Sequence, residues 1–434
     1  MEYNMKLTKI LLVGIAVLST TAMFAQRAGD YEEILDFSEA QKKELTHLGK
    51  GELSIGGDVR FEFQSIKEKY NDLDVTGSKS RNNPDAVTTA DQGFDVEVNL
   101  VIDHKTENTW AHAKLAFDND AGAGSVIDTT NVSEFAAAGV HDFTGANNNI
   151  ALEQAYFGIN LFEDGASRLD FELGRNFGYK WFDSKIQFAS RFDGAFLKYG
   201  NSFEGVGDFY IKAGSFLINE KRDHYGSVGE LGIMDIADTG LYVKYSYISW
   251  PKSSISNYYR EVAASNDINR EFQFRNSQAT LGYVFNPAWL NNNETKLYGA
   301  YLVNHVARKE GIVADINSKE NAAYYVGLSV GDVKVKGDWF VDVNYQSVEA
   351  QAIAGFDVHG IGIGIGDTAN AEMYTDRYGN TNYKGYEIDA LYAITDSLSI
   401  SFDWESTQVL EKRVDTAEQQ HSYKKFEIET IYAF

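Results

Sequence analysis

The stretch that decides the fold lies near the C-terminal end and reads Leu398-Ser399-Ile400-Ser401-Phe402-Asp403-Trp404-Glu405. Apolar and polar residues alternate at every step, so an extended strand would carry all the apolar side chains on one face and all the polar ones on the other. Across the chain such apolar faces are about five residues deep, which at strand rise and tilt matches a lipid-facing band of ~25 Å. The stretch therefore predicts a membrane-spanning strand between lipid and a polar lumen.

The same alternation recurs along the chain. It covers Leu53 to Phe63, Phe94 to Ile102 and Leu169 to Leu173, with charged residues on the opposite face in each case. A soluble β-sandwich also alternates, but its strands run ~5 to 6 residues, and most of the strands predicted around these runs are about twice as long. We therefore expect an all-β fold, a transmembrane antiparallel β-barrel.

Sixteen strands are predicted, an even number as single-chain bacterial barrels require. Eighteen strands is the alternative, because either of the longest connections has room for another hairpin. The predicted ranges are 53–66, 93–106, 109–118, 150–162, 167–175, 190–200, 206–218, 229–237, 240–250, 272–286, 294–307, 321–331, 333–347, 383–394, 397–410 and 421–434.

The connections alternate in length, which indicates the orientation of the barrel. Tight turns fall at 107–108, 163–166, 237–239 and 395–396, whereas 119–149, 251–271 and 348–382 are long. Short turns are typical of the periplasmic side and long loops of the exterior. All three prolines, Pro84, Pro251 and Pro287, lie in connections, as expected if every strand is needed for pairing.

The two chain ends carry targeting features. Residues 1–25 have the layout of a secretory signal peptide, and their apolar run is too short for the ~20 residues of a spanning helix. Residues 26–50 form a lead-in with a short N-terminal helix predicted over 37–48, and 51–434 form the barrel. At the other end Phe426, Ile428, Tyr432 and Phe434 share one face, which is typical of the terminal strand that the outer-membrane barrel-assembly machinery recognises.

Composition excludes several classes of function. The 434 residues carry a formal net charge of -24, which excludes a nucleic-acid binder, since a phosphate backbone needs a basic partner. Cys is 0, so thiolate metal sites and cysteine nucleophiles are absent, and the 8 histidines show no metal-type pair. No enzyme activity and no cofactor is expected. The acidic stretches 118–120 and 367–376 offer oxygen ligands for loop-bound Ca²⁺, but simple solvation explains them better.

The connection 176–189 is the candidate pore constriction. It is rich in aromatic residues, and it is the third external loop, which in sixteen-stranded porins folds inward. Its charged set is Arg175, Lys180, Asp183, Lys185, Arg191 and Asp193, which would create a transverse field across the pore. An ordinary exposed loop is the alternative, in which case 119–149 or 348–382 would constrict the pore.

The inward positions of the strands are acidic on balance and predict the pore lining. This set comprises Asp58, Arg60, Glu62, Asp95, Glu97, Lys114, Arg168, Asp170, Glu172, Lys244, Glu387, Asp389, Asp403 and Glu405. Acidic walls favour cations and the basic loop favours anions, so we expect weak ion selectivity at high salt.

Three short motifs carry a family resemblance: Leu152-Glu153-Gln154-Ala155-Tyr156, Leu173-Gly174-Arg175 and Arg191-Phe192-Asp193-Gly194. They resemble the alginate-export-like porin family of Gram-negative outer membranes. That resemblance implies a barrel of usually eighteen strands and passive diffusion of small polar solutes or anionic sugars. The expected partners are outer-membrane lipid, the assembly machinery and small-molecule solutes, with the oligomeric state left open. A non-conducting structural or adhesive barrel is the alternative function, and a barrel-rim hydrolase a more distant one.

Overall fold

The computed structural model describes residues 43–48, 51–70, 73–74, 92–120, 150–220, 223–251, 273–308, 319–361, 381–411 and 421–434. The expected signal peptide, the stretch 367–376 and most of the connections 119–149 and 251–271 lie outside the described residues.

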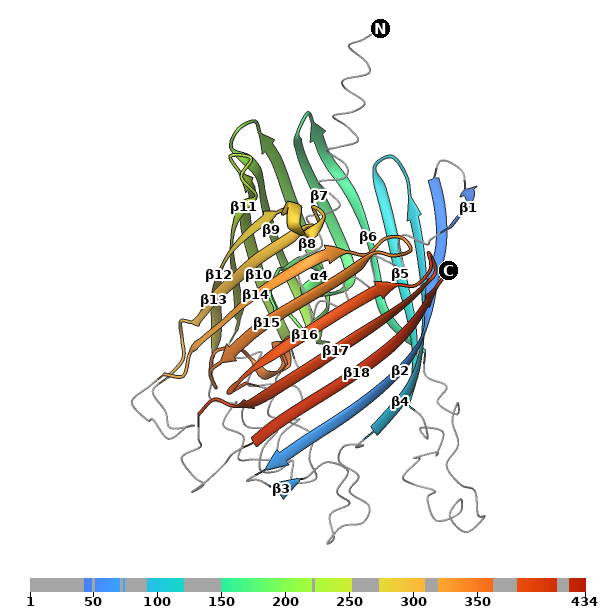
Figure 1. The fold of residues 1–434 in the computed structure, drawn as a ribbon. Coiled ribbons are helices and arrows are strands. Elements are labelled where there is room, and N and C mark those ends of the chain that lie inside the picture. The colour runs from blue at the N-terminus through green and yellow to red at the C-terminus, as the bar shows by residue number, and fades with distance from the viewer. Residues whose placement is uncertain are drawn as a thin grey trace.

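Sixteen long antiparallel strands close into a barrel (Figure 1), which confirms the predicted fold and strand count. They are β2 (Gly51–Tyr70), β4 (Gln92–Lys105), β5 (Thr109–Asp120), β6 (Ala151–Asp164), β7 (Ser167–Phe177), β8 (Arg191–Phe203), β9 (Gly207–Asn219), β10 (His224–Ile236), β11 (Leu241–Trp250), β12 (Phe274–Phe285), β13 (Thr295–Asn304), β14 (Ala322–Asp332), β15 (Trp339–Val348), β16 (Tyr383–Ala393), β17 (Leu398–Val409) and β18 (His421–Ala433). Two short strands, β1 (Lys43–Leu48) and β3 (Leu73–Asp74), pair with β2.

The alternation along each strand sorts side chains between the two faces of the barrel wall. On β16 the side chain of Tyr386 is 55% exposed, whereas the next residue, Glu387, is 2% exposed. Glu405, which lies directly opposite Glu387 on the neighbouring strand β17, is also buried. Ile400 on β17 is exposed. Apolar groups thus face outward and polar groups inward, which is the arrangement that a barrel in lipid requires.

The last strand closes the ring against the first long one. β18 pairs with β2 from His421 opposite Tyr70 to Ala433 opposite Asp58, and Phe434 exchanges two backbone hydrogen bonds with Gly57, of 2.9 and 3.0 Å. A Cβ at Gly57 would lie 2.2 Å from the carbonyl oxygen of Asn99, so only glycine fits there. Tyr432 and Phe434 point outward, because they alternate with Ile431 and Ala433, which are fully buried. By the same alternation Phe426 and Ile428 also lie on the outer face.

The expected N-terminal helix over 37–48 is wrong where it is described, because Lys43–Leu48 is strand β1. β1 pairs with residues 51–55 of β2, beyond the point where β18 ends. An unpaired β-edge offers every backbone group a partner, and this outweighs a local capping pattern. The strand predicted from 333 starts at Trp339, since 333–338 form a turn with Gly337 at φ 91°. No helix among the described residues is long and apolar enough to cross a membrane.

Candidate pore constriction

The connection between β7 and β8 folds into the barrel and lies along the inner surface of its wall (Figure 1). It begins with the short helix α4 (Gly178–Trp181). Four contacts then fix it to four strands of the wall. Lys212 Nζ on β9 donates to the carbonyl of Trp181 (2.6 Å), and Lys244 on β11 pairs with Asp183 (2.6 Å). Ser184 donates to Gln278 on β12 (2.7 Å), and Lys185 pairs with Asp342 on β15 (3.2 Å). The segment 181–185 therefore spans the wall from β9 to β15.

The tip of this connection is buried inside the barrel. Ile186 is fully buried and belongs to one apolar cluster with Tyr298, Tyr325 and Tyr383, which come from β13, β14 and β16. Trp181, Phe182 and Phe188 belong to a second buried cluster with residues of β8 to β12. An ordinary solvent-exposed loop would not bury its apolar tip in this way.

A second segment, 349–361, lies against the first and was expected only as an alternative constriction. Gln187 forms an isolated β-bridge with Val358, and the N–H of His359 donates to the carbonyl of Ile186 (2.9 Å). The carboxylate of Asp357 accepts hydrogen bonds from Ser190 Oγ (2.7 Å) and Gln187 Nε2 (3.3 Å). The lumen thus holds a ribbon of two segments that are far apart in sequence.

Burial and nearby charges set the ionisation of the two central groups of this ribbon. Burial alone would lower the pKa of Lys185, but the carboxylates of Asp342, Glu387 and Asp389 raise it above its usual range, so the ammonium keeps its proton. Burial raises the pKa of Asp357 to about 6, although the hydrogen bonds from Ser190 and Gln187 oppose that shift.

Arg175 and Asp193 do not belong to the interior. They are direct neighbours across β7 and β8 and form a two-pronged pair with distances of 2.7 and 2.9 Å. The flanking pair on the same face is Leu173 and Ala195, and the side chains of Arg175 and Asp193 are 40% and 55% exposed. Strand parity therefore places them on the outer face, which corrects their assignment to the constriction.

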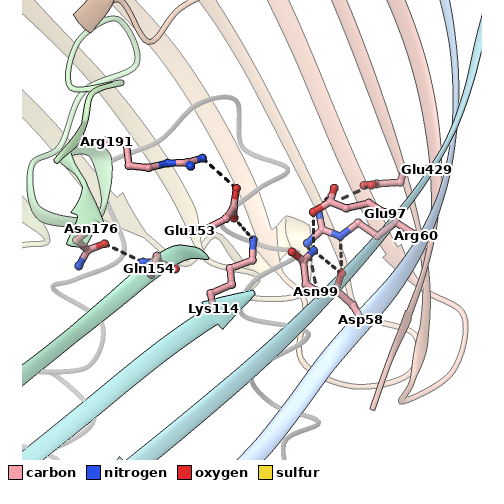
Figure 2. A network of polar contacts seen from close by, with 10 residues as sticks. All are labelled: Asp58, Arg60, Glu97, Asn99, Lys114, Glu153, Gln154, Asn176, Arg191 and Glu429. Atoms are coloured by element: carbon pink, nitrogen blue, oxygen red, sulfur yellow. Dashed lines mark hydrogen bonds and ion pairs between the residues drawn. The ribbon is translucent and has the colours of Figure 1, made fainter. Parts of the chain in front are cut away.

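The other two basic residues expected at the constriction, Lys180 and Arg191, contact different groups. Lys180 Nζ lies 5.9 Å from the ring centroid of Tyr179. Arg191, the first residue of β8, donates to Glu153 (3.2 Å), which also pairs with Lys114 (2.9 Å); Figure 2 shows this carboxylate between the two cations. Arg191 thus contacts Glu153 rather than facing Asp193 across a gap.

The predicted lining residues fall on the inner face of their strands, apart from Asp95, whose side chain is not described. Arg60 is the centre of the first group (Figure 2): it pairs with Asp58 at 2.6 Å, and Glu97 and Glu429 lie 3.9 and 3.8 Å away. A second group consists of Glu387, Asp403 and Glu405. One carboxylate oxygen of each residue lies within 4.8 Å of the other two.

Sequence reasoning missed several residues that hold the constriction. These are Asp342, Gln278, Lys212, Glu230 and Asp357. For the first two the signal was present, since Val341 and Val343 alternate with Asp342, and the neighbours of Gln278 are small or apolar. No local pattern distinguishes Asp357, because its role comes from contacts with a distant segment.

A closed sixteen-stranded antiparallel barrel with an apolar outer face and a connection folded into a polar lumen has the fold of the outer-membrane porins. Solved structures of porins are similar to this chain. OprB of Pseudomonas putida is similar over 94% of this chain and 96% of its own, at 12% identity and a TM-score of 0.50. A double mutant of Rhodopseudomonas blastica porin matches 88% of this chain and 100% of its own, at 12% identity and a TM-score of 0.43. No family model and no curated protein matches the chain.

Proposed function

We propose that this protein is an outer-membrane porin of a Gram-negative bacterium, through which small polar solutes diffuse passively. The observation that carries the proposal is the connection 178–190, fixed across the inner wall from β9 to β15. A segment held in that position narrows the lumen to a defined aperture, and the narrowest cross-section controls flux.

A transport role explains the polar interior better than the alternatives do. Buried charges reduce stability unless they are well paired, so a purely structural barrel would gain from an apolar filling. The inner wall instead carries charged groups on most strands, such as Arg60, Lys114 and Glu387. We therefore place the non-conducting structural or adhesive barrel second, and we propose no catalytic role.

The alginate-export-like relationship, with anionic sugars as solutes, is a narrower proposal. Its three motifs lie on β6, β7 and β8, the strands that flank the entry of the constricting connection. However, Arg175 faces outward, so this motif contributes no cation to the lumen for an anionic sugar. We therefore base the proposal on the aperture rather than on that substrate.

Swelling of liposomes that contain the purified protein tests the proposed function. We expect swelling in isotonic solutions of small sugars, with a rate that falls steeply as the sugar becomes larger. Liposomes containing heat-denatured protein are the control. Swelling no faster than in this control would show that the lumen does not conduct and would favour the structural barrel.

A further inference from the structure

We infer that the channel selects cations over anions, so that its solutes are neutral or positively charged; this inference rests on the proposed porin function. It follows from the way in which the structure distributes charge around the lumen. The basic residues expected at the constriction do not create an anion-selective ring, and one sector of the inner wall is strongly acidic.

Three of the four cations expected at the constriction pair with carboxylates, one of them on the outer face. The fourth, Lys180, is partly exposed beside the ring of Tyr179. Lys185 is 7% exposed and pairs with Asp342 at 3.2 Å. Arg191 pairs with Glu153, and Arg175 pairs with Asp193 on the outer face. Their charges are compensated at short range, so they add little to the field that a permeating ion meets.

The sector formed by β16, β17 and β18 carries the opposite charge. Its inward positions include Glu387, Asp389, Asp403, Glu405, Glu427 and Glu429, against one cation, Lys425. Glu387 lies directly opposite Glu405, and Asp389 directly opposite Asp403. Like charges in directly opposed positions destabilise a sheet, so this sector has an acidity that folding alone does not favour.

The rest of the wall offsets this sector only in part, since Arg60 on β2 lies 3.8 Å from Glu429 but also pairs with Asp58 at 2.6 Å. On the far side Lys212 lies 3.7 Å from Glu230, and Lys244 pairs with Asp183 of the connection. These lysines are thus matched locally by acids. The ammonium of Lys185 approaches this sector from the connection, where the carboxylates of Glu387 and Asp389 stabilise its charge. A low-dielectric wall focuses the remaining negative field into the pore and concentrates cations there.

The reversal potential of the purified protein in a planar bilayer, under a tenfold KCl gradient, tests the inference. We expect K⁺ to be about threefold or more as permeant as Cl⁻ at low salt, with the ratio falling towards one near 1 M salt, where the screening length is ~3 Å. Equal permeability at low salt, or preference for Cl⁻, would overturn the inference while leaving the porin intact. Absence of any conductance would instead overturn the proposed function.

Two matched variants locate the source of the selectivity. Asp403→Asn removes one inward charge from the acidic sector, opposite Asp389, and we expect the K⁺/Cl⁻ ratio to fall by about twofold. Asp193→Asn removes one acid from the outer face and should leave the ratio unchanged. Equal effects of both variants would show that the acidic sector does not set the selectivity. Heat-modifiable migration on gels verifies that each variant is folded.

Discussion

Lys185 and Asp342 form an ion pair inside the barrel, with Nζ 3.2 Å from Oδ1 and both side chains almost completely buried. Asp342 also accepts a hydrogen bond of 2.7 Å from the hydroxyl of Tyr298. The pair joins the connection between β7 and β8 to the opposite part of the wall. Because loss of one partner leaves the other charge buried, the position of the connection depends on this contact.

Lys185→Met should release the tip of the connection. Asp342, Glu387 and Asp389 would lose their shared cation, which by analogy with other buried pairs costs about 3 to 5 kcal/mol. We expect larger and noisier single-channel currents and new protease cleavage within 178–190. The control is Lys180→Met, since Lys180 is partly exposed beside Tyr179. Currents as quiet as those of the parent would show that the pair does not hold the connection.

Asp342→Asn should release the connection between β7 and β8 less than Lys185→Met does. The ammonium would keep Glu387 and Asp389 nearby, and the amide oxygen would still accept the hydrogen bond from Tyr298. We expect an intermediate rise in current noise. A larger effect than that of Lys185→Met would mean that Asp342 acts through a contact other than the ion pair.

Acidification should strengthen the contact between the two inward segments. Asp357 has its pKa raised from 3.8 to about 6 in the docked arrangement, so the docked form binds the proton more tightly. Docking therefore gains stability as the pH falls through 6 and reaches its full gain below 3.8, on the order of 3 kcal/mol. We expect steadier and lower conductance at pH 4.5 than at pH 7.5. Asp357→Asn should abolish this dependence on pH, and an unchanged dependence would assign it to another group.

The placement of Arg175 and Asp193 has its own test. Arg175→Gln combined with Asp193→Asn should leave conductance and ion selectivity unchanged, because both side chains lie on the outer face. A surface ion pair contributes only about 0 to 1 kcal/mol, so the barrel should also remain folded. A clear shift in reversal potential would show that the two side chains face the lumen after all.

Removal of Phe434 should impair closure of the barrel. The residue makes two backbone hydrogen bonds with Gly57, and its ring lies beside that glycine. We expect a lower yield of heat-modifiable barrel in the outer membrane. Phe434→Leu keeps the backbone bonds, so it should assemble better than the truncated chain. Equal yields for the two variants would show that the backbone bonds are not limiting.

Most of the barrel could be predicted from the sequence. Successive side chains of a strand face lipid and lumen in turn, so apolar and polar residues alternate along it. Continued by two residues beyond Leu173, the same alternation predicts that the side chain of Arg175 faces outward, as the structure has it. The prediction of a helix over 37–48 is wrong for Lys43–Leu48, which form strand β1. This strand pairs with a free edge of β2, and no local sequence pattern indicates that edge. The pairing of Gln187 with Val358, and with it the second inward segment, depends on contacts between distant parts of the chain.

The central claim is that an inward-folded connection sets the aperture of a conducting barrel. Single-channel conductance, measured in planar bilayers for the parent protein and for a variant lacking Trp181 to Ser184, tests it most directly. This deletion removes the contacts with Lys212, Lys244 and Gln278 but no lipid-facing residue of any strand. We expect discrete conductance steps for the parent and clearly larger steps for the folded variant. Equal steps in the two proteins, or no steps in the parent, would contradict the claim.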